Sequence, residues 1–97
     1  MSTETLKKTK KTNLEPPRYK VLLLNDDYTP SDFVVYVLKR YFSLNELEAN
    51  RVMLEAHQSG VSVAGVYSFE IAETKANQAM KEASNQQYPF SCMLEPE

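Results

Sequence analysis

Apolar residues form three short runs that have the length and composition of β-strands. Tyr19–Leu24 is mainly apolar and is followed at once by the turn-forming residues Asn25-Asp26-Asp27, a pattern that predicts a buried strand ending abruptly. Val61–Tyr67 is rich in β-branched and aromatic residues and predicts a second strand. At the end of the chain Phe90, Cys92 and Leu94 alternate with Ser91 and Met93, which predicts a third strand.

Helical spacing begins after the first predicted strand. Thr29-Pro30-Ser31-Asp32 is typical of a helix start, with Thr29 as the cap, Pro30 at the first helical position and Asp32 closing a capping box. The apolar stripe that follows consists of Phe33, Val34, Val37, Leu38, Tyr41 and Phe42.

Two further helices are predicted from the same kind of signal. Ser43 and Glu46 repeat the start pattern, so we expect a helix from about Leu44 to Gln58, with Gly60 as its left-handed C-terminal residue. The apolar residues of this helix are Leu47, Val52, Met53, Leu54 and Ala56. Ser68 is expected to cap a helix of about Phe69–Ala83, which carries Ala72, Ala76, Ala79, Met80 and Ala83 on one face.

The elements therefore occur in the order β-α-α-β-α-β. We expect an α+β fold in which three helices pack on one face of a three-stranded antiparallel sheet. This domain spans residues 18–97. Residues 1–17 lack a hydrophobic period and end in Glu15-Pro16-Pro17, so they are expected to form a disordered N-terminal extension.

Composition and charge narrow the possible functions. The 97 residues have a net charge of −2, with the lysines of the extension giving it +2 and residues 18–97 carrying −4. An acidic domain argues against nucleic-acid binding, and no apolar run approaches the ~20 residues of a membrane span. Cys92 is the only cysteine, which excludes an internal disulfide and a multi-cysteine zinc site and suits the cytoplasm.

The segment Asn25-Asp26-Asp27 is the main candidate for chemistry. Read as an ordinary turn, its side chains hydrogen-bond the local backbone. Read as a site, they present oxygen acceptors and negative charge at the start of a helix, which suits a cation, and His57 faces them if the second helix packs beside the first strand. A metal site made of Asp26, Asp27 and His57 lacks a further ligand pair. No nucleophile motif or phosphate loop is present, so we expect neither an enzyme nor a cofactor.

These residues resemble the ClpS adaptors of the N-degron pathway. The resemblance covers about Pro16 to Glu95 and rests first on the string Asn25-Asp26-Asp27-Tyr28-Thr29-Pro30. Supporting matches are Met53 to His57, Gly60, Gly65-Val66, Ala72-Glu73-Thr74-Lys75 and Pro89. It implies an adaptor that binds proteins whose first residue is Leu, Phe, Tyr or Trp and delivers them to the AAA+ unfoldase ClpA for degradation by ClpP.

The resemblance also implies a role for each site residue. Asn25, Asp27 and His57 would accept hydrogen bonds from the α-amino group, with Asp26 shaping the loop. Thr29 and Pro30 would line the mouth of a pocket for the first side chain, whose apolar positions correspond to Val34, Met53, Ala56 and Phe90. Ser31 departs from the family, which commonly has Met there, and we expect a wider pocket that accepts Ile or Val.

Partner contacts are implied elsewhere on the chain. Glu70 and Lys75 would face the N-terminal domain of the unfoldase, and residues 1–17 would be the segment that its pore engages. We expect a monomer. The alternative hypothesis is a general interaction domain that uses its sheet edge or a helix surface and has no selectivity for the N-terminal residue.

Overall fold

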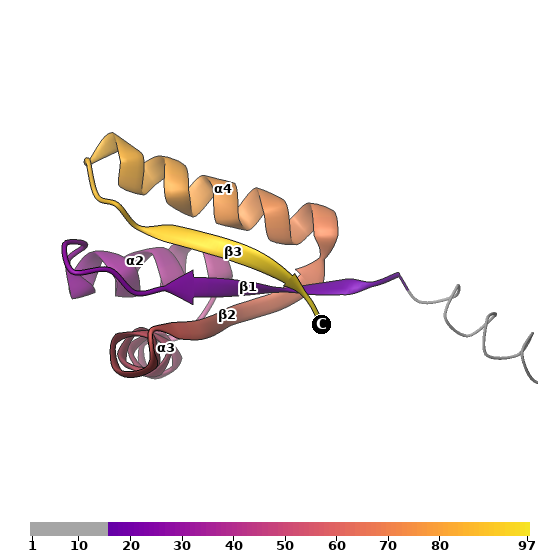
Figure 1. Ribbon diagram of the computed structural model, residues 1–97, viewed down its shortest axis with the longest axis horizontal. Coiled ribbons are helices and arrows are strands. Elements are labelled where there is room, and N and C mark those ends of the chain that lie inside the picture. The colour runs from indigo at the N-terminus through magenta and orange to yellow at the C-terminus, as the bar shows by residue number, and fades with distance from the viewer. Residues whose placement is uncertain (1–15) are drawn as a thin grey trace, which may run out of the picture.

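The computed structural model describes residues 16–97 and confirms the predicted order of elements (Figure 1). The elements are β1 (Arg18–Leu24), α2 (Ser31–Phe42), α3 (Glu46–Ser59), β2 (Val61–Ser68), α4 (Phe69–Asn85) and β3 (Ser91–Pro96). β1 is the central strand and pairs antiparallel with both β2 and β3. The fold is therefore α+β, with a three-stranded antiparallel sheet and three helices.

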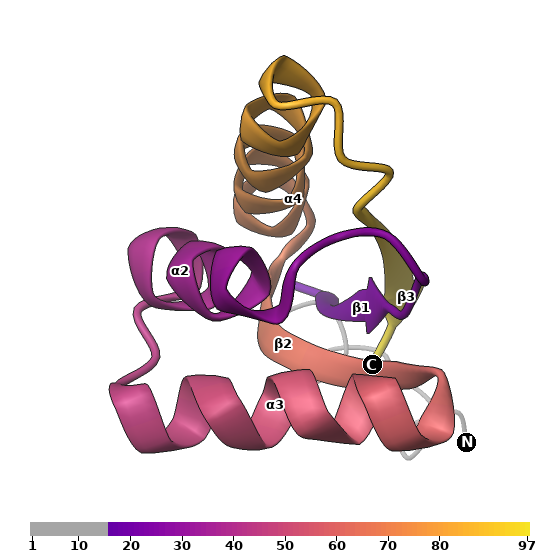
Figure 2. The ribbon, with the colours of Figure 1, turned by 90° about the vertical axis from the view of Figure 1, so that its left-hand side faces the viewer.

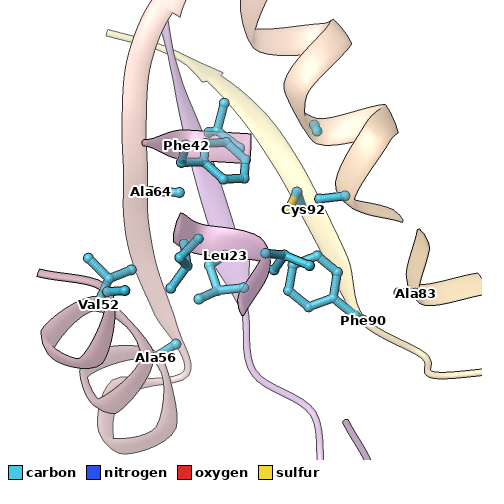
Figure 3. Close-up of a cluster of buried hydrophobic side chains, with 14 of the residues drawn as sticks. Leu23, Phe42, Val52, Ala56, Ala64, Ala83, Phe90 and Cys92 are labelled. Atoms are coloured by element: carbon cyan, nitrogen blue, oxygen red, sulfur yellow. The ribbon is translucent and has the colours of Figure 1, made fainter. Parts of the chain in front are cut away.

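The core lies between the sheet and the three helices (Figure 2). Because side chains alternate along a strand, Leu23, Ala64 and Cys92 point from the three strands toward the same side and are buried. Figure 3 shows these residues close to Phe42 of α2 and Val52 of α3. On α4 the predicted alanine stripe is buried, which lets this helix lie close to its neighbours; its residues are Ala72, Ala76, Ala79 and Ala83.

The predicted cap of the first helix is wrong. The N-cap residue of α2 is Pro30 rather than Thr29, and it makes no side-chain capping bond. The hydroxyl of Thr29 instead donates to Oδ2 of Asp26 at 2.9 Å. The Thr29 hydroxyl therefore acts as a donor to a carboxylate within the turn and not as the oxygen acceptor of a helix cap.

The start of the second helix is also displaced from its predicted place. Ser43 has φ 58°, and its backbone N–H donates to the carbonyl of Leu38, so it ends α2. The N-cap of α3 is Asn45, whose side-chain oxygen accepts from the backbone N–H of Glu48 at 2.8 Å. Serine and asparagine are comparable N-cap residues, so the backbone decides: Ser43 is left-handed and ends α2, whereas Asn45 has the extended backbone of an N-cap.

The apolar stripe predicted for the second helix is partly wrong. Leu47 is 79% exposed and Leu54 is 48% exposed, whereas Ala49, Val52 and Ala56 are buried. The buried residues follow each other at spacings of three and four and so share one face of α3. Leu47 and Leu54 are seven residues apart and lie together on another face.

Smaller differences occur toward the end of the chain. α4 continues to Asn85, two residues beyond the predicted end, and β3 begins at Ser91 rather than Phe90. Ser68 is the N-cap residue of α4, as predicted, although its side chain makes no capping hydrogen bond.

Among residues 16–97 no helix is long and apolar enough to cross a membrane. The extension predicted for residues 1–17 lies outside the described residues except for Pro16 and Pro17.

Candidate functional site

The loop between β1 and α2 is organised by one side chain, that of Asp26. Its Oδ1 accepts hydrogen bonds from the backbone N–H groups of Tyr28 at 2.8 Å and Thr29 at 2.7 Å, and its Oδ2 accepts from the Thr29 hydroxyl. Burial acts to raise the pKa of Asp26, but these three hydrogen bonds outweigh it and hold the pKa below its usual value. Asp26 is therefore ionised at neutral pH and fixes the loop. Asn25 and Asp27, on either side of it, are exposed.

The end of α3 is joined to this loop through Gly60. The backbone N–H of Asn25 donates to the carbonyl of Gly60 at 3.0 Å. Gly60 has φ 91°, a left-handed conformation that glycine adopts without strain, and it closes α3 by donating to the carbonyl of Ala56. His57, in the last turn of α3, is thereby brought to the same end of the molecule as Asn25 and Asp27.

A hollow of about 320 Å³ lies where these segments meet. Its lining comprises Leu23, Leu24, Asn25, Asp26, Asp27, Tyr28, Thr29, Pro30, Ser31, Val34, Met53, Ala56 and His57. The acceptor side chains of Asn25, Asp27 and His57 are exposed, whereas Val34 and Met53 are half-buried and Ala56 is buried. The site thus combines acceptors of hydrogen bonds with an apolar wall, and its volume suits a small ligand.

The structure brings together every residue predicted for the α-amino site and the pocket except Phe90. Phe90 is buried in the core, where its ring lies edge-on to that of Phe33 with centroids 6.2 Å apart, and it is not part of the lining. Three lining residues were not singled out from the sequence: Leu23, Leu24 and Tyr28. Only their place in the sequence could have pointed to them, because Leu23 and Leu24 end the strand before the loop and Tyr28 lies inside it.

The two residues predicted for the partner interface lie away from the hollow, on α4. Glu70 is exposed in the first turn. Lys75 is half-buried; its Nζ donates to the carbonyl of Tyr41 at 2.9 Å and lies 5.3 Å from the centroid of the Tyr67 ring. Lys75 therefore also ties α4 to the C-terminal end of α2.

The chemistry of the site is that of binding. Within residues 16–97 no three His, Cys, Asp or Glu side chains are grouped so that they could hold a metal ion. Burial raises the pKa of the Cys92 thiol to about 12, so this residue is a core side chain rather than a nucleophile. The hollow can hold a cationic group against its acceptors and an apolar group against its wall.

Comparison with known proteins agrees with this arrangement. Residues 14–93 match the family described as "ATP-dependent Clp protease adaptor protein ClpS". The ClpS adapter of Ruegeria sp. is 53% identical over 90 residues, which are 93% of this chain and 80% of the relative. The ClpS adapter of Rhodospirillum centenum is 51% identical over 94 residues, 97% of this chain and 87% of the relative.

A solved structure is similar over most of the chain. Agrobacterium tumefaciens ClpS2, bound to L-phenylalaninamide, superposes with a TM-score of 0.83 and 46% identity and covers 86% of this chain and 100% of that chain. The sequence match over residues 14–93, the near full-length relatives and the shared fold lead to one conclusion: the chain belongs to the ClpS family of Clp protease adaptors, which are not enzymes.

Proposed function

We propose that this adaptor binds the N-terminal residue of proteins that begin with Leu, Phe, Tyr or Trp and delivers them to a Clp protease. The observation that carries the proposal is the hollow itself, in which Asn25, Asp27 and His57 stand beside an apolar wall. The ligand of the Agrobacterium relative has the matching chemistry, because L-phenylalaninamide carries a free α-amino group next to a benzyl side chain.

The α-amino group is held by three acceptors in this proposal. A protonated amine has three N–H donors, and acceptors that converge from different segments satisfy them best. The amide oxygen of Asn25 and the carboxylate of Asp27 come from the loop, and the imidazole of His57 comes from α3. The imidazole must be neutral, because a charged ring has no acceptor nitrogen and repels the amine. Asp26 contributes by fixing the loop.

The first side chain is received by the apolar wall of Val34, Met53 and Ala56, with Thr29 and Pro30 at the mouth. Burial of one Leu or Phe side chain contributes about 1.5–3 kcal/mol. Each charge-assisted hydrogen bond contributes about 1.5–3 kcal/mol as well. Two or three such bonds and one side chain reach the ~8 kcal/mol of a micromolar complex after the losses of association.

The simplest test is a calorimetric titration with L-phenylalaninamide, using L-alaninamide as the control. The two ligands share the α-amino group and differ only in the side chain. We expect L-phenylalaninamide to bind at least about tenfold more tightly, the difference that burial of the larger side chain produces. Equal binding of the two ligands would contradict a role for the apolar wall.

The partner in this proposal is the N-terminal domain of a ClpA-type AAA+ unfoldase, with ClpP as the protease. Glu70 and Lys75 on α4 are the proposed contacts, and residues 1–17 are the segment that the unfoldase engages. One copy of the chain is sufficient, because the hollow is built from β1, the following loop, α2 and α3 of a single molecule. Such delivery takes place in the cytoplasm.

Ser31 is proposed to widen the range of first residues that the hollow accepts. It is exposed, lines the hollow and lies one helical turn before Val34, so a short side chain there leaves room for a β-branched group. We expect L-isoleucinamide to bind more tightly than L-alaninamide. The substitution Ser31→Met should weaken the binding of L-isoleucinamide by about tenfold and leave the affinity for L-leucinamide within about twofold of the natural value. If L-isoleucinamide and L-alaninamide bind alike to the natural chain, the site is not widened.

A further inference from the structure

Tyr28 is an aromatic side chain held at the rim of the hollow yet almost fully open to solvent. It is 79% exposed and belongs to the lining. Its backbone N–H is fixed by Oδ1 of Asp26 at 2.8 Å, and the next residue is fixed by two further bonds to the same carboxylate. The backbone beneath the ring is therefore rigid, although the ring itself packs into no core.

Exposure alone does not assign a role to Tyr28. Leu47 on α3 is also 79% exposed, and single exposed apolar residues are common on protein surfaces. The difference is location, because Leu47 lies outside the lining and Tyr28 is part of it. A tyrosine ring on a fixed backbone binds with little loss of conformational freedom, since only two torsion angles become ordered.

The path of a bound polypeptide passes Tyr28. In the proposed function, the first residue places its amine at Asn25 and Asp27 and its side chain against the apolar wall, so the chain must leave through the mouth. One residue spans at most about 3.6 Å, so the second side chain stays close to the site of the first. Tyr28 lies in sequence between Asp27, which binds the amine, and Thr29, which lines the mouth.

We propose that Tyr28 forms a subsite for the second residue of the bound protein, one that favours an aromatic side chain there. The inference rests on the proposed function. The ring of Tyr28 offers a face and an edge to an aromatic side chain, and such pairs add affinity beyond simple burial. The site then reads two residues, the first by its amine and apolar wall and the second by Tyr28.

The test compares three ligands by calorimetry, each with a free α-amino group and an amidated C-terminus: L-phenylalaninamide and the tripeptides Phe-Ala-Ala and Phe-Tyr-Ala. The natural chain should bind Phe-Tyr-Ala about fivefold more tightly than Phe-Ala-Ala. Tyr28→Ala should bring the two tripeptides to equal affinity. L-phenylalaninamide, which has no second residue, measures any effect of the variant on binding of the first residue. Tyr28→Phe should keep the preference, and Leu47→Ala, which removes an equally exposed side chain outside the lining, should change nothing.

The outcomes separate this inference from the proposed function. If L-phenylalaninamide does not bind the natural chain, the proposed function fails. If it binds but the two tripeptides bind alike, the subsite does not exist. If Tyr28→Ala weakens all three ligands by the same factor, the ring supports the loop or the first residue, and the subsite is again excluded. Unchanged binding of L-phenylalaninamide to Tyr28→Ala also shows that the variant is folded.

Discussion

Removal of residues 1–17 is expected to abolish delivery of a Phe-leading substrate while leaving its affinity for the adaptor unchanged. The affinity should not change because the cut and the binding loop lie at opposite ends of β1. The truncation stops before Arg18, and β1 runs seven residues from there to Leu24, where the binding loop begins. At about 3.3 Å per residue the binding loop begins roughly 20 Å from the cut. Figure 1 shows the start and the end of β1 on opposite sides of the domain, so the truncation does not reach the loop.

The measurement is degradation of a fluorescent protein that begins with Phe by the Clp unfoldase and protease, with natural or truncated adaptor present. The truncated chain should support no degradation above the rate without adaptor. A matched control carries the same 17 residues in scrambled order and tests whether length and composition suffice. The proposed role of the segment would be wrong if the truncated chain delivered at the natural rate. The division between binding and delivery would be wrong if it lost affinity for L-phenylalaninamide.

His57→Ala is expected to weaken the binding of L-phenylalaninamide by about ten- to a hundredfold without lowering the stability of the fold. His57 is exposed in the last turn of α3, so its removal leaves no cavity. Loss of one charge-assisted hydrogen bond corresponds to about 1.5–3 kcal/mol, which gives this range. Calorimetry measures the affinity, and thermal unfolding measures the stability.

Gln58→Ala is the matched control for this variant. Gln58 is the next residue on α3, is also exposed and is not part of the lining. Gln58→Ala should leave the affinity for L-phenylalaninamide within about twofold of the natural value. If His57→Ala binds as tightly as Gln58→Ala, the imidazole does not contact the amine. In that case the acceptors that remain are those of Asn25 and Asp27.

The order of elements could be predicted because apolar spacing, together with the turn and cap residues between the elements, carries it. The strands before Asn25 and after Gly60, and the alanine stripe of α4, follow from periods of two and 3.6 residues. Details at helix ends could not be predicted in the same way. Whether Thr29 caps α2 or bonds Asp26 depends on how the loop folds, and the local string is compatible with both. A cap would use the hydroxyl oxygen to accept from a backbone N–H, whereas in the structure the hydroxyl donates to Asp26. Which of the two occurs is decided by the three-dimensional structure of the loop.

Most residues of the candidate site could also be predicted from the sequence. The polar residues next to the first strand and the histidine before Gly60 stood out, and the structure places both on one hollow. Phe90 was expected in the pocket but lies in the core beside Phe33 and outside the lining, a placement that no sequence spacing reveals. Tyr28 was overlooked because the strand and helix periods do not extend into a loop.

A substitution of Lys75 would not test the partner interface alone. Its ammonium bonds the carbonyl of Tyr41 and lies over Tyr67, so a substitution there disturbs the packing of α4 as well as any contact with the unfoldase. Glu70 is the cleaner probe, because it is exposed at the start of α4 and belongs to none of the contacts that hold Lys75.

The most direct test of the account is a titration of the natural chain with a Phe-leading peptide whose amine is free, and with the same peptide acetylated. Acetylation removes the positive charge and two of the three N–H donors and keeps the side chain. If Asn25, Asp27 and His57 hold a protonated amine, the acetylated peptide should bind at least about a hundredfold more weakly, since acceptors that have lost their donors remain at the contact. Equal affinity for both peptides would contradict the account and would favour a surface that binds internal segments of polypeptide.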